Sequence, residues 1–144
     1  MSLKDGTKKM SKSELSDLSR INLTDDKDQI VNKIKKAKTD PLPMPSTIEE
    51  LEGRAEAANL IGIYSSLSDQ KLEKSLQEFS GKNFSLFKER LSEVIVNKIN
   101  PISIEINKLL NEKNYLDKIL TDGCKKADEI ASQKIKKIHE IMGF

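Results

Sequence analysis

The chain has 144 residues, of which 25 are lysine or arginine and 23 are aspartate or glutamate, so the charges nearly cancel. No overall field therefore indicates a nucleic acid or a membrane as the partner, and any basic surface must be local. Charged residues make up 33% and aromatic residues only 4%, which favours aliphatic helices over β-sheet. The single cysteine, Cys124, excludes an intrachain disulfide, and no apolar run has the length of a membrane span or forms a signal peptide. We expect a soluble, cytoplasmic protein with one domain-sized core.

The first segment of interest is residues 7–14, TKKMSKSE, which follow a turn signal at Gly6. The segment contains lysines and hydroxyl groups but no apolar periodicity, and its one hydrophobic residue is Met10. A segment with nothing to bury predicts a flexible loop.

The next element is a predicted helix whose N-cap is Thr24 or Asp25. Acidic residues in its first turn suit a helix N-terminus. Its apolar residues share one side and its lysines project elsewhere, which predicts a basic outer face. The apolar side holds Ile30, Val31, Ile34 and Ala37, and the basic face holds Lys33, Lys35 and Lys36. The helix ends before the proline-rich linker at 39–46.

Two further helices are predicted between the linker and Gly81. The spacing of Ser46 and Glu49 resembles a capping box and predicts a short helical turn over 47–52. A stronger helix follows at 54–67, and Ser68 is expected to cap the next one, which Gly81 ends. The residues expected to face inward are Ala57, Leu60, Ile61, Tyr64, Leu72, Leu76 and Phe79.

The remainder is predicted to form two long helices. An apolar stripe that begins at Phe84 keeps its phase across Pro101, which predicts one helix kinked near residues 97–101. A final helix is expected over 115–142, with an irregularity at Gly123. Its expected buried residues are Cys124, Ala127, Ile130, Ala131, Ile135, Ile138, Ile141 and Met142. We therefore predict an all-α helical bundle over 24–144.

Residues 24–144 contain no catalytic or metal-binding constellation that the sequence supports. His139, the only histidine, has no Cys or His at metal-ligand spacing, so we expect a structural role for it and no metal site. Lysine clusters around 33–38 and 125–137 could bind phosphates, although solubilising surface charge explains them equally well. Neither cluster has aromatic residues for stacking bases.

Lys9, Met10, Ser11, Lys12 and Ser13 spell KMSKS, the signature of class I aminoacyl-tRNA synthetases. The whole chain resembles the C-terminal part of the bacterial tryptophanyl-tRNA synthetases within that class. The resemblance rests on five stretches in the family's order and spacing: MSLKDGTKKMSKSE, IKKAKTD, NLIGIYSSLS, GKNFSLFKERLSEVI and DGCKKADEIASQKIKKIHEIMGF. The chain departs from the commoner pattern at 39–46 and 49–58, so the resemblance leaves the path of this linker open.

The resemblance implies a longer enzyme whose Rossmann domain and tryptophan pocket lie before Met1. Residues 1–23 would then be the KMSKS loop with a remnant of the catalytic domain, and 24–144 an α-helical anticodon-binding domain. Because the packing partners of the loop would belong to the other domain, we expect residues 1–23 to be disordered in this piece.

The family activates L-tryptophan with ATP and transfers it to tRNA(Trp). The resemblance implies that the ATP phosphates, accompanied by Mg²⁺ in the full-length enzyme, are bound by Lys9–Ser13, with Lys9 and Lys12 as catalytic residues. It also implies tRNA contacts from the helical lysines, for which the candidates are Lys33, Lys35, Lys36, Lys125 and Lys126. The full-length enzyme is expected to be a homodimer. The piece alone is expected to be monomeric and inactive and to bind no cofactor tightly.

Two alternatives remain open at this point. One is a stand-alone helical RNA-binding or adaptor module that keeps a vestigial synthetase loop. The other is a structural bundle with a chance KMSKS match, which the resemblance along the whole chain disfavours. A reading frame that continues upstream of Met1 into a nucleotide-binding domain would favour the enzyme over the adaptor.

Overall fold

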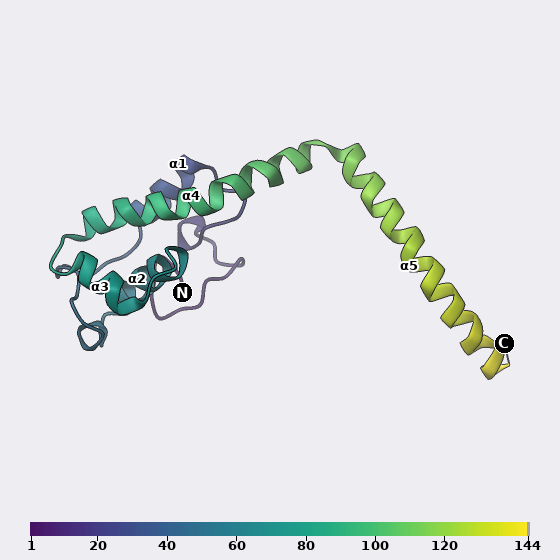
Figure 1. Cartoon of the computed structure of the whole chain (residues 1–144), viewed down its shortest axis with the longest axis horizontal. Coiled ribbons are helices and arrows are strands. Elements are labelled where there is room, and N and C mark those ends of the chain that lie inside the picture. The colour runs from purple at the N-terminus through teal and green to yellow at the C-terminus, as the bar shows by residue number, and fades with distance from the viewer. Residues whose placement is uncertain (144) are drawn as a thin grey trace. The chain divides into compact units, whose positions relative to one another are not determined.

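The computed structural model describes residues 1–143, and in this range the backbone forms helices and turns but no strand. The prediction of an all-α fold is therefore confirmed for the described residues. The chain divides into two compact units, Met1–Ile104 and Glu105–Phe144. No helix in the described range is both long and apolar enough to cross a membrane. The elements are η1 Asp17–Ser19, α1 Lys27–Lys35, η2 Glu49–Leu51, α2 Ala55–Leu67, α3 Leu72–Phe79, α4 Phe84–Asn111 and α5 Lys113–Met142 (Figure 1).

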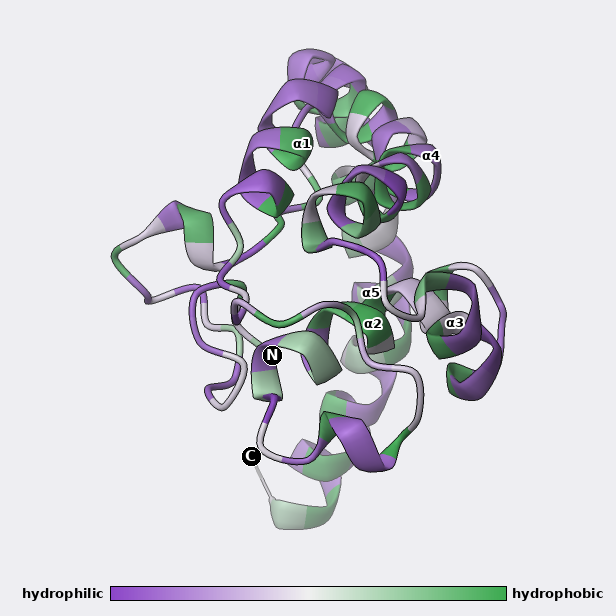
Figure 2. Ribbon diagram, turned by 90° about the vertical axis from the view of Figure 1, so that its left-hand side faces the viewer, coloured by the Kyte–Doolittle hydropathy of each residue, from purple (hydrophilic) through white to green (hydrophobic). Residues whose placement is uncertain are grey.

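The core of the first unit is built around aromatic rings from α2, α3 and α4. Tyr64 and Phe79 pack edge to face with centroids 4.9 Å apart, and Phe79 and Phe87 meet at the same distance. Edge-to-face pairs add to the stabilisation that burial gives. The inward-facing residues predicted for α2 are all buried. Figure 2 shows hydrophilic and hydrophobic residues interspersed along α1, α3 and α4, as amphipathic helices require.

Three predicted helix caps are wrong. The N-cap of η2 is Ile48 and no side chain caps this turn, so the capping box predicted from Ser46 and Glu49 does not form. Asp26, and not Thr24 or Asp25, caps α1: its carboxylate accepts from the Gln29 backbone N–H, and the Gln29 side chain accepts from the Asp26 N–H. Ser68 lies at the C-terminal end of α2, where its hydroxyl donates to the carbonyl of Tyr64. The sequence offered several capping residues in a row, and the backbone path selects among them.

α4 continues through Pro101 as one helix, which confirms the predicted continuity, whereas the kink expected near residues 97–101 stays a prediction. Its apolar stripe is covered at Phe87, Leu91 and Ile95, whereas Ile102 is 45% exposed.

α5 differs more from expectation, because none of its described residues is buried. The prediction that its apolar face lies in the core is therefore wrong, and Cys124 is exposed rather than packed. The helix also passes Gly123 without a break. Helical periodicity indicates which face of a helix is apolar, but it does not show whether another segment packs against that face. The exposed residues predicted to be buried are Cys124, Ala127, Ile130, Ala131, Ile135, Ile138, Ile141 and Met142.

The N-terminal segment has packing partners inside this chain, so the expectation that all of residues 1–23 are disordered is wrong. Leu3 is buried, its N–H donates to the carbonyl of Ser19 at 2.8 Å, and its carbonyl accepts from the N–H of Lys38 at 2.8 Å. Gly6 lies so close to α2 that a Cβ there would stand 2.4 Å from the carbonyl oxygen of Ala55. These contacts fix the chain on both sides of the KMSKS loop.

Candidate phosphate-binding loop

The KMSKS loop, Lys9–Ser13, lies at the surface of the first unit. Lys9, Ser11, Lys12 and Ser13 are exposed, and Met10 is half-buried against the core. The hydroxyls of Ser11 and Ser13 lie 2.9 Å apart, and the N–H of Ser13 donates to Ser11 Oγ at 3.3 Å. Met10 is therefore the only loop residue that packs, and it leaves the polar residues on either side facing solvent.

The residues before the loop form a compact turn. The carbonyl of Lys8 accepts from the Ser2 N–H at 2.8 Å, and the Lys8 N–H donates to the carbonyl of Asp5. The Asp5 carboxylate accepts from both the hydroxyl and the backbone N–H of Thr7. These hydrogen bonds lower the pKa of Asp5. The loop thus begins from a fixed point.

The residues after the loop are held by Arg20. Its guanidinium donates to the carbonyl of Glu14 at 2.9 Å, with a longer contact of 3.5 Å to the carbonyl of Ser11. It also contacts Asp17 at 3.1 Å and donates from Nε to Asn22 Oδ1 at 3.2 Å. One side chain therefore joins the loop backbone to the turn that leads into α1.

Lys33 lies inside the protein, which corrects the prediction that it belongs to a basic outer face. Its side chain is 4% exposed, and its ammonium lies 2.6 Å from both Asp17 Oδ2 and Asp25 Oδ2. Hydrogen bonds from Lys33 and then from Asn22 lower the pKa of Asp17. A lysine is buried only when its charge is compensated, and here two carboxylates compensate it.

The other four lysines proposed as tRNA contacts are exposed. Lys35 and Lys36 are exposed at the C-terminal end of α1, and Lys125 and Lys126 are exposed on α5 in the second unit. All four have the exposure that a phosphate contact needs. The structure therefore leaves four of the five candidates available at the surface.

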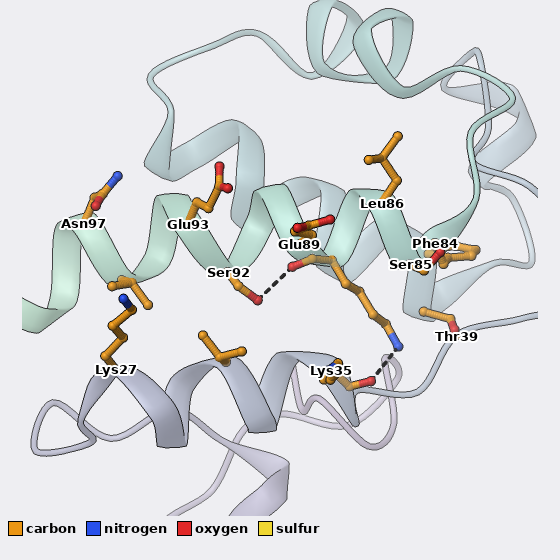
Figure 3. A pocket seen from close by; sticks show the side chains of 13 residues that line it. Lys27, Lys35, Thr39, Phe84, Ser85, Leu86, Glu89, Ser92, Glu93 and Asn97 are labelled. Atoms are coloured by element: carbon orange, nitrogen blue, oxygen red, sulfur yellow. Dashed lines mark hydrogen bonds between the residues drawn. The ribbon is translucent and has the colours of Figure 1, made fainter.

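A groove of about 1000 Å³ lies between α1 and α4 (Figure 3). Lys88 lines the groove and donates hydrogen bonds to the carbonyls of Ala37 at 2.6 Å and Lys35 at 3.2 Å, so its ammonium satisfies carbonyl groups at the C-terminal end of α1. Burial lowers the pKa of Lys88. The groove mixes lysines with Glu89 and Glu93 and has no uniform charge.

Two ammonium groups in the loop are available for a ligand. Among the described residues, neither Lys9 nor Lys12 forms an ion pair, whereas Lys8 next to them contacts Asp5 at 3.6 Å. Exposed lysines with neighbouring hydroxyls suit oxygens of high charge density, above all those of phosphates. The sequence motif identifies the loop but does not indicate that Arg20 holds its backbone. The available signal was an arginine close in sequence to two acidic residues, Asp17 and Asp25.

The model of the family described as tRNA synthetases class I (W and Y) matches residues 1–100. The chain belongs to this family.

Its curated relatives include tryptophan–tRNA ligases. That of Agrobacterium fabrum is 53% identical over all 144 residues, which correspond to 41% of that relative, and that of Rickettsia felis is 49% identical with 43% of the relative covered. The crystal structure of tryptophanyl-tRNA synthetase from Mycoplasma pneumoniae superposes with a TM-score of 0.61 and 29% identity, over 75% of this chain and 34% of that one. The chain thus spans about two fifths of the length of its curated relatives.

Proposed function

We propose that this chain is the C-terminal part of a tryptophan–tRNA ligase, in which the KMSKS loop binds the phosphates of ATP and the helices bind tRNA(Trp). The observation that carries the proposal is the loop itself. Lys9 and Lys12 are exposed and without ion pairs among the described residues, and both flanks of the loop are fixed to one core. Identity of 53% to a tryptophan–tRNA ligase along the whole chain supports the choice of substrate.

The proposed chemistry needs positive charge that can follow a moving phosphate. In amino-acid activation, the tryptophan carboxylate attacks the α-phosphate and pyrophosphate leaves, so negative charge builds on the departing oxygens. Ammonium groups aimed at those oxygens stabilise the transition state more than the ground state. Lys9 and Lys12 have long stems and face solvent, and Ser11 and Ser13 can add hydrogen bonds. The loop has no carboxylates, so it suits the phosphate oxygens of Mg²⁺–ATP and not the metal ion, which arrives as part of the substrate.

The helical part would hold the tRNA at a distance from the ATP. Lys35, Lys36, Lys125 and Lys126 are exposed and can contact the phosphate backbone, which positions a nucleic acid without reading its sequence. Lys33 is not part of this proposal, because its ammonium is bound by Asp17 and Asp25. A homodimeric full-length enzyme and a cytoplasmic location belong to the same proposal.

The test is Lys12→Ala in the full-length enzyme, measured by ATP–pyrophosphate exchange. We expect the exchange rate to fall on the order of a hundredfold, while the KM for tryptophan stays nearly unchanged, because the ammonium interacts with the phosphates mainly in the transition state. Lys9→Ala should act in the same direction. The matched control is Lys8→Ala, which removes the exposed lysine directly before Lys9. Because this lysine pairs with Asp5, the substitution should change the rate less than about twofold. Normal exchange in both loop variants would refute the proposal.

A further inference from the structure

The backbone at the C-terminal end of the KMSKS loop is held by one guanidinium. Arg20 is mostly buried, with a side chain 17% exposed. Its NH1 group donates to the carbonyl of Glu14 at 2.9 Å and lies 3.5 Å from the carbonyl of Ser11. Lys12 lies between these two residues in sequence. The position of the backbone that carries the Lys12 side chain therefore depends on Arg20.

The guanidinium is itself oriented from its other side. Its NH2 group contacts Asp17 Oδ1 at 3.1 Å, and Nε donates to Asn22 Oδ1 at 3.2 Å. The second oxygen of Asp17 is 2.6 Å from the buried ammonium of Lys33 on α1. A continuous series of contacts thus runs from the buried Lys33 of α1, through the Asp17 carboxylate and the Arg20 guanidinium, to the loop backbone.

We infer that Arg20 is a positioning residue for the proposed activation of tryptophan, and that it acts by fixing the backbone on both sides of Lys12. The inference rests on the proposed function, since it concerns the same loop. The exposed side chains of the loop contact no core, so hydrogen bonds to its backbone restrict the directions in which Lys12 can point. Small misplacements of a catalytic group cost rate because its contact with the developing charge depends on geometry.

Arg54 offers a matched comparison that separates positioning from general structural support. It is also mostly buried, with a side chain 14% exposed, and it binds a carboxylate, that of Asp40, at 2.7 Å. It also donates to a loop carbonyl, that of Pro43, at 2.9 Å. Arg54 therefore makes the same kinds of contact as Arg20, but to the proline-rich linker instead of the KMSKS loop.

The experiment is a double-mutant cycle between Arg20→Ala and Lys12→Ala in the full-length enzyme, measured by ATP–pyrophosphate exchange at saturating substrates. We expect Arg20→Ala to lower kcat on the order of tenfold with the KM for tryptophan unchanged. In the Lys12→Ala background, the same substitution should lower kcat less than about twofold, because the group it positions is gone. Arg54→Ala should change kcat less than about twofold in either background.

Arg20→Lys covers the case in which the alanine variant folds poorly. Lysine keeps the charge beside Asp17 but has no planar fork to reach Glu14 and Asn22 together, so we expect it to restore stability without restoring kcat. Independent, multiplicative effects of Arg20→Ala and Lys12→Ala would overturn the inference while leaving the proposed function intact, as would full activity in Arg20→Lys or an equal loss in Arg54→Ala. Normal exchange in Lys12→Ala would overturn the inference, and normal exchange in both Lys9→Ala and Lys12→Ala would overturn the proposed function with it.

Discussion

The Lys33 ammonium lies 2.6 Å from Asp25 Oδ2, and the two side chains are only 4% and 5% exposed. Asp25 also accepts hydrogen bonds from the backbone and side chain of Asn22. The pair joins α1 to the turn that precedes it. Because Asp17 binds the same ammonium from the exposed side, Lys33 is one of the links between the chain leaving the KMSKS loop and the interior.

We expect Lys33→Met to destabilise the protein by about 3–5 kcal/mol, because it leaves Asp25 buried without its cation. Asp17→Asn removes a carboxylate that is 56% exposed and should cost less than about 1 kcal/mol. Urea unfolding followed by circular dichroism measures both. An equal loss of unfolding free energy in the two variants would contradict the larger contribution expected from the buried Lys33–Asp25 pair.

Gly6→Ala should destabilise the protein, because the new Cβ would stand 2.4 Å from the backbone carbonyl oxygen of Ala55. Backbone at both sides must shift to relieve this overlap, which costs about 1–3 kcal/mol. The matched control is Gly62→Ala in α2, where a Cβ meets nothing within 4 Å. There we expect stabilisation by up to about 1 kcal/mol from helix propensity. A neutral Gly6→Ala in thermal unfolding would contradict the close contact.

The Asp40–Arg54 pair should contribute to the loss of stability in acid. Burial by itself raises the pKa of Asp40, but hydrogen bonds from Arg54 and the Leu42 N–H outweigh it and hold the pKa below the ordinary 3.8. A carboxyl whose pKa is lower in the folded state contributes stability that is complete above 3.8 and is lost as the pH falls through the lower folded value.

Asp40→Asn should therefore lower stability at neutral pH by about 1–3 kcal/mol and flatten its decline below pH 3.8. Glu52→Gln, which replaces an exposed carboxyl directly after η2, is the control and should leave the decline of stability at low pH in place. Unfolding free energies measured across the acid range test the prediction. An unchanged acid limb in Asp40→Asn would rule out the contribution of this pair.

tRNA(Trp) binding by the chain should weaken steeply with added salt if lysines contact phosphates. Replacing Lys125 and Lys126 by alanine should lower the affinity for all tRNA sequences alike and reduce the salt slope by about one for each phosphate that is no longer neutralised. Lys74→Ala, an exposed lysine on α3 outside the proposed tRNA-binding lysines, serves as the control. Filter binding at several salt concentrations measures the slope, and an unchanged slope in the double variant would remove these two lysines from the interface.

Local signals in the sequence determined the helices, the linker and the candidate loop. Apolar spacing predicted α2 with its buried Ala57, Leu60, Ile61 and Tyr64, and the continuity of α4 across Pro101. These features depend on neighbours within a few turns of the chain, which a sequence displays directly. KMSKS is likewise contiguous, so the loop was found without knowing the fold.

Tertiary structure decided which faces are covered and which charges are free. Lys33 and Lys35 are two residues apart on the same helix, yet one is buried on carboxylates and the other is exposed. Leu3 is buried in the core, and its backbone is hydrogen-bonded to Ser19 and Lys38, which are distant from it in sequence. The apolar residues of α5 are exposed although their spacing is as regular as that of α2. Burial depends on segments that are distant in sequence, and a repeat of 3.6 residues holds no information about where they lie.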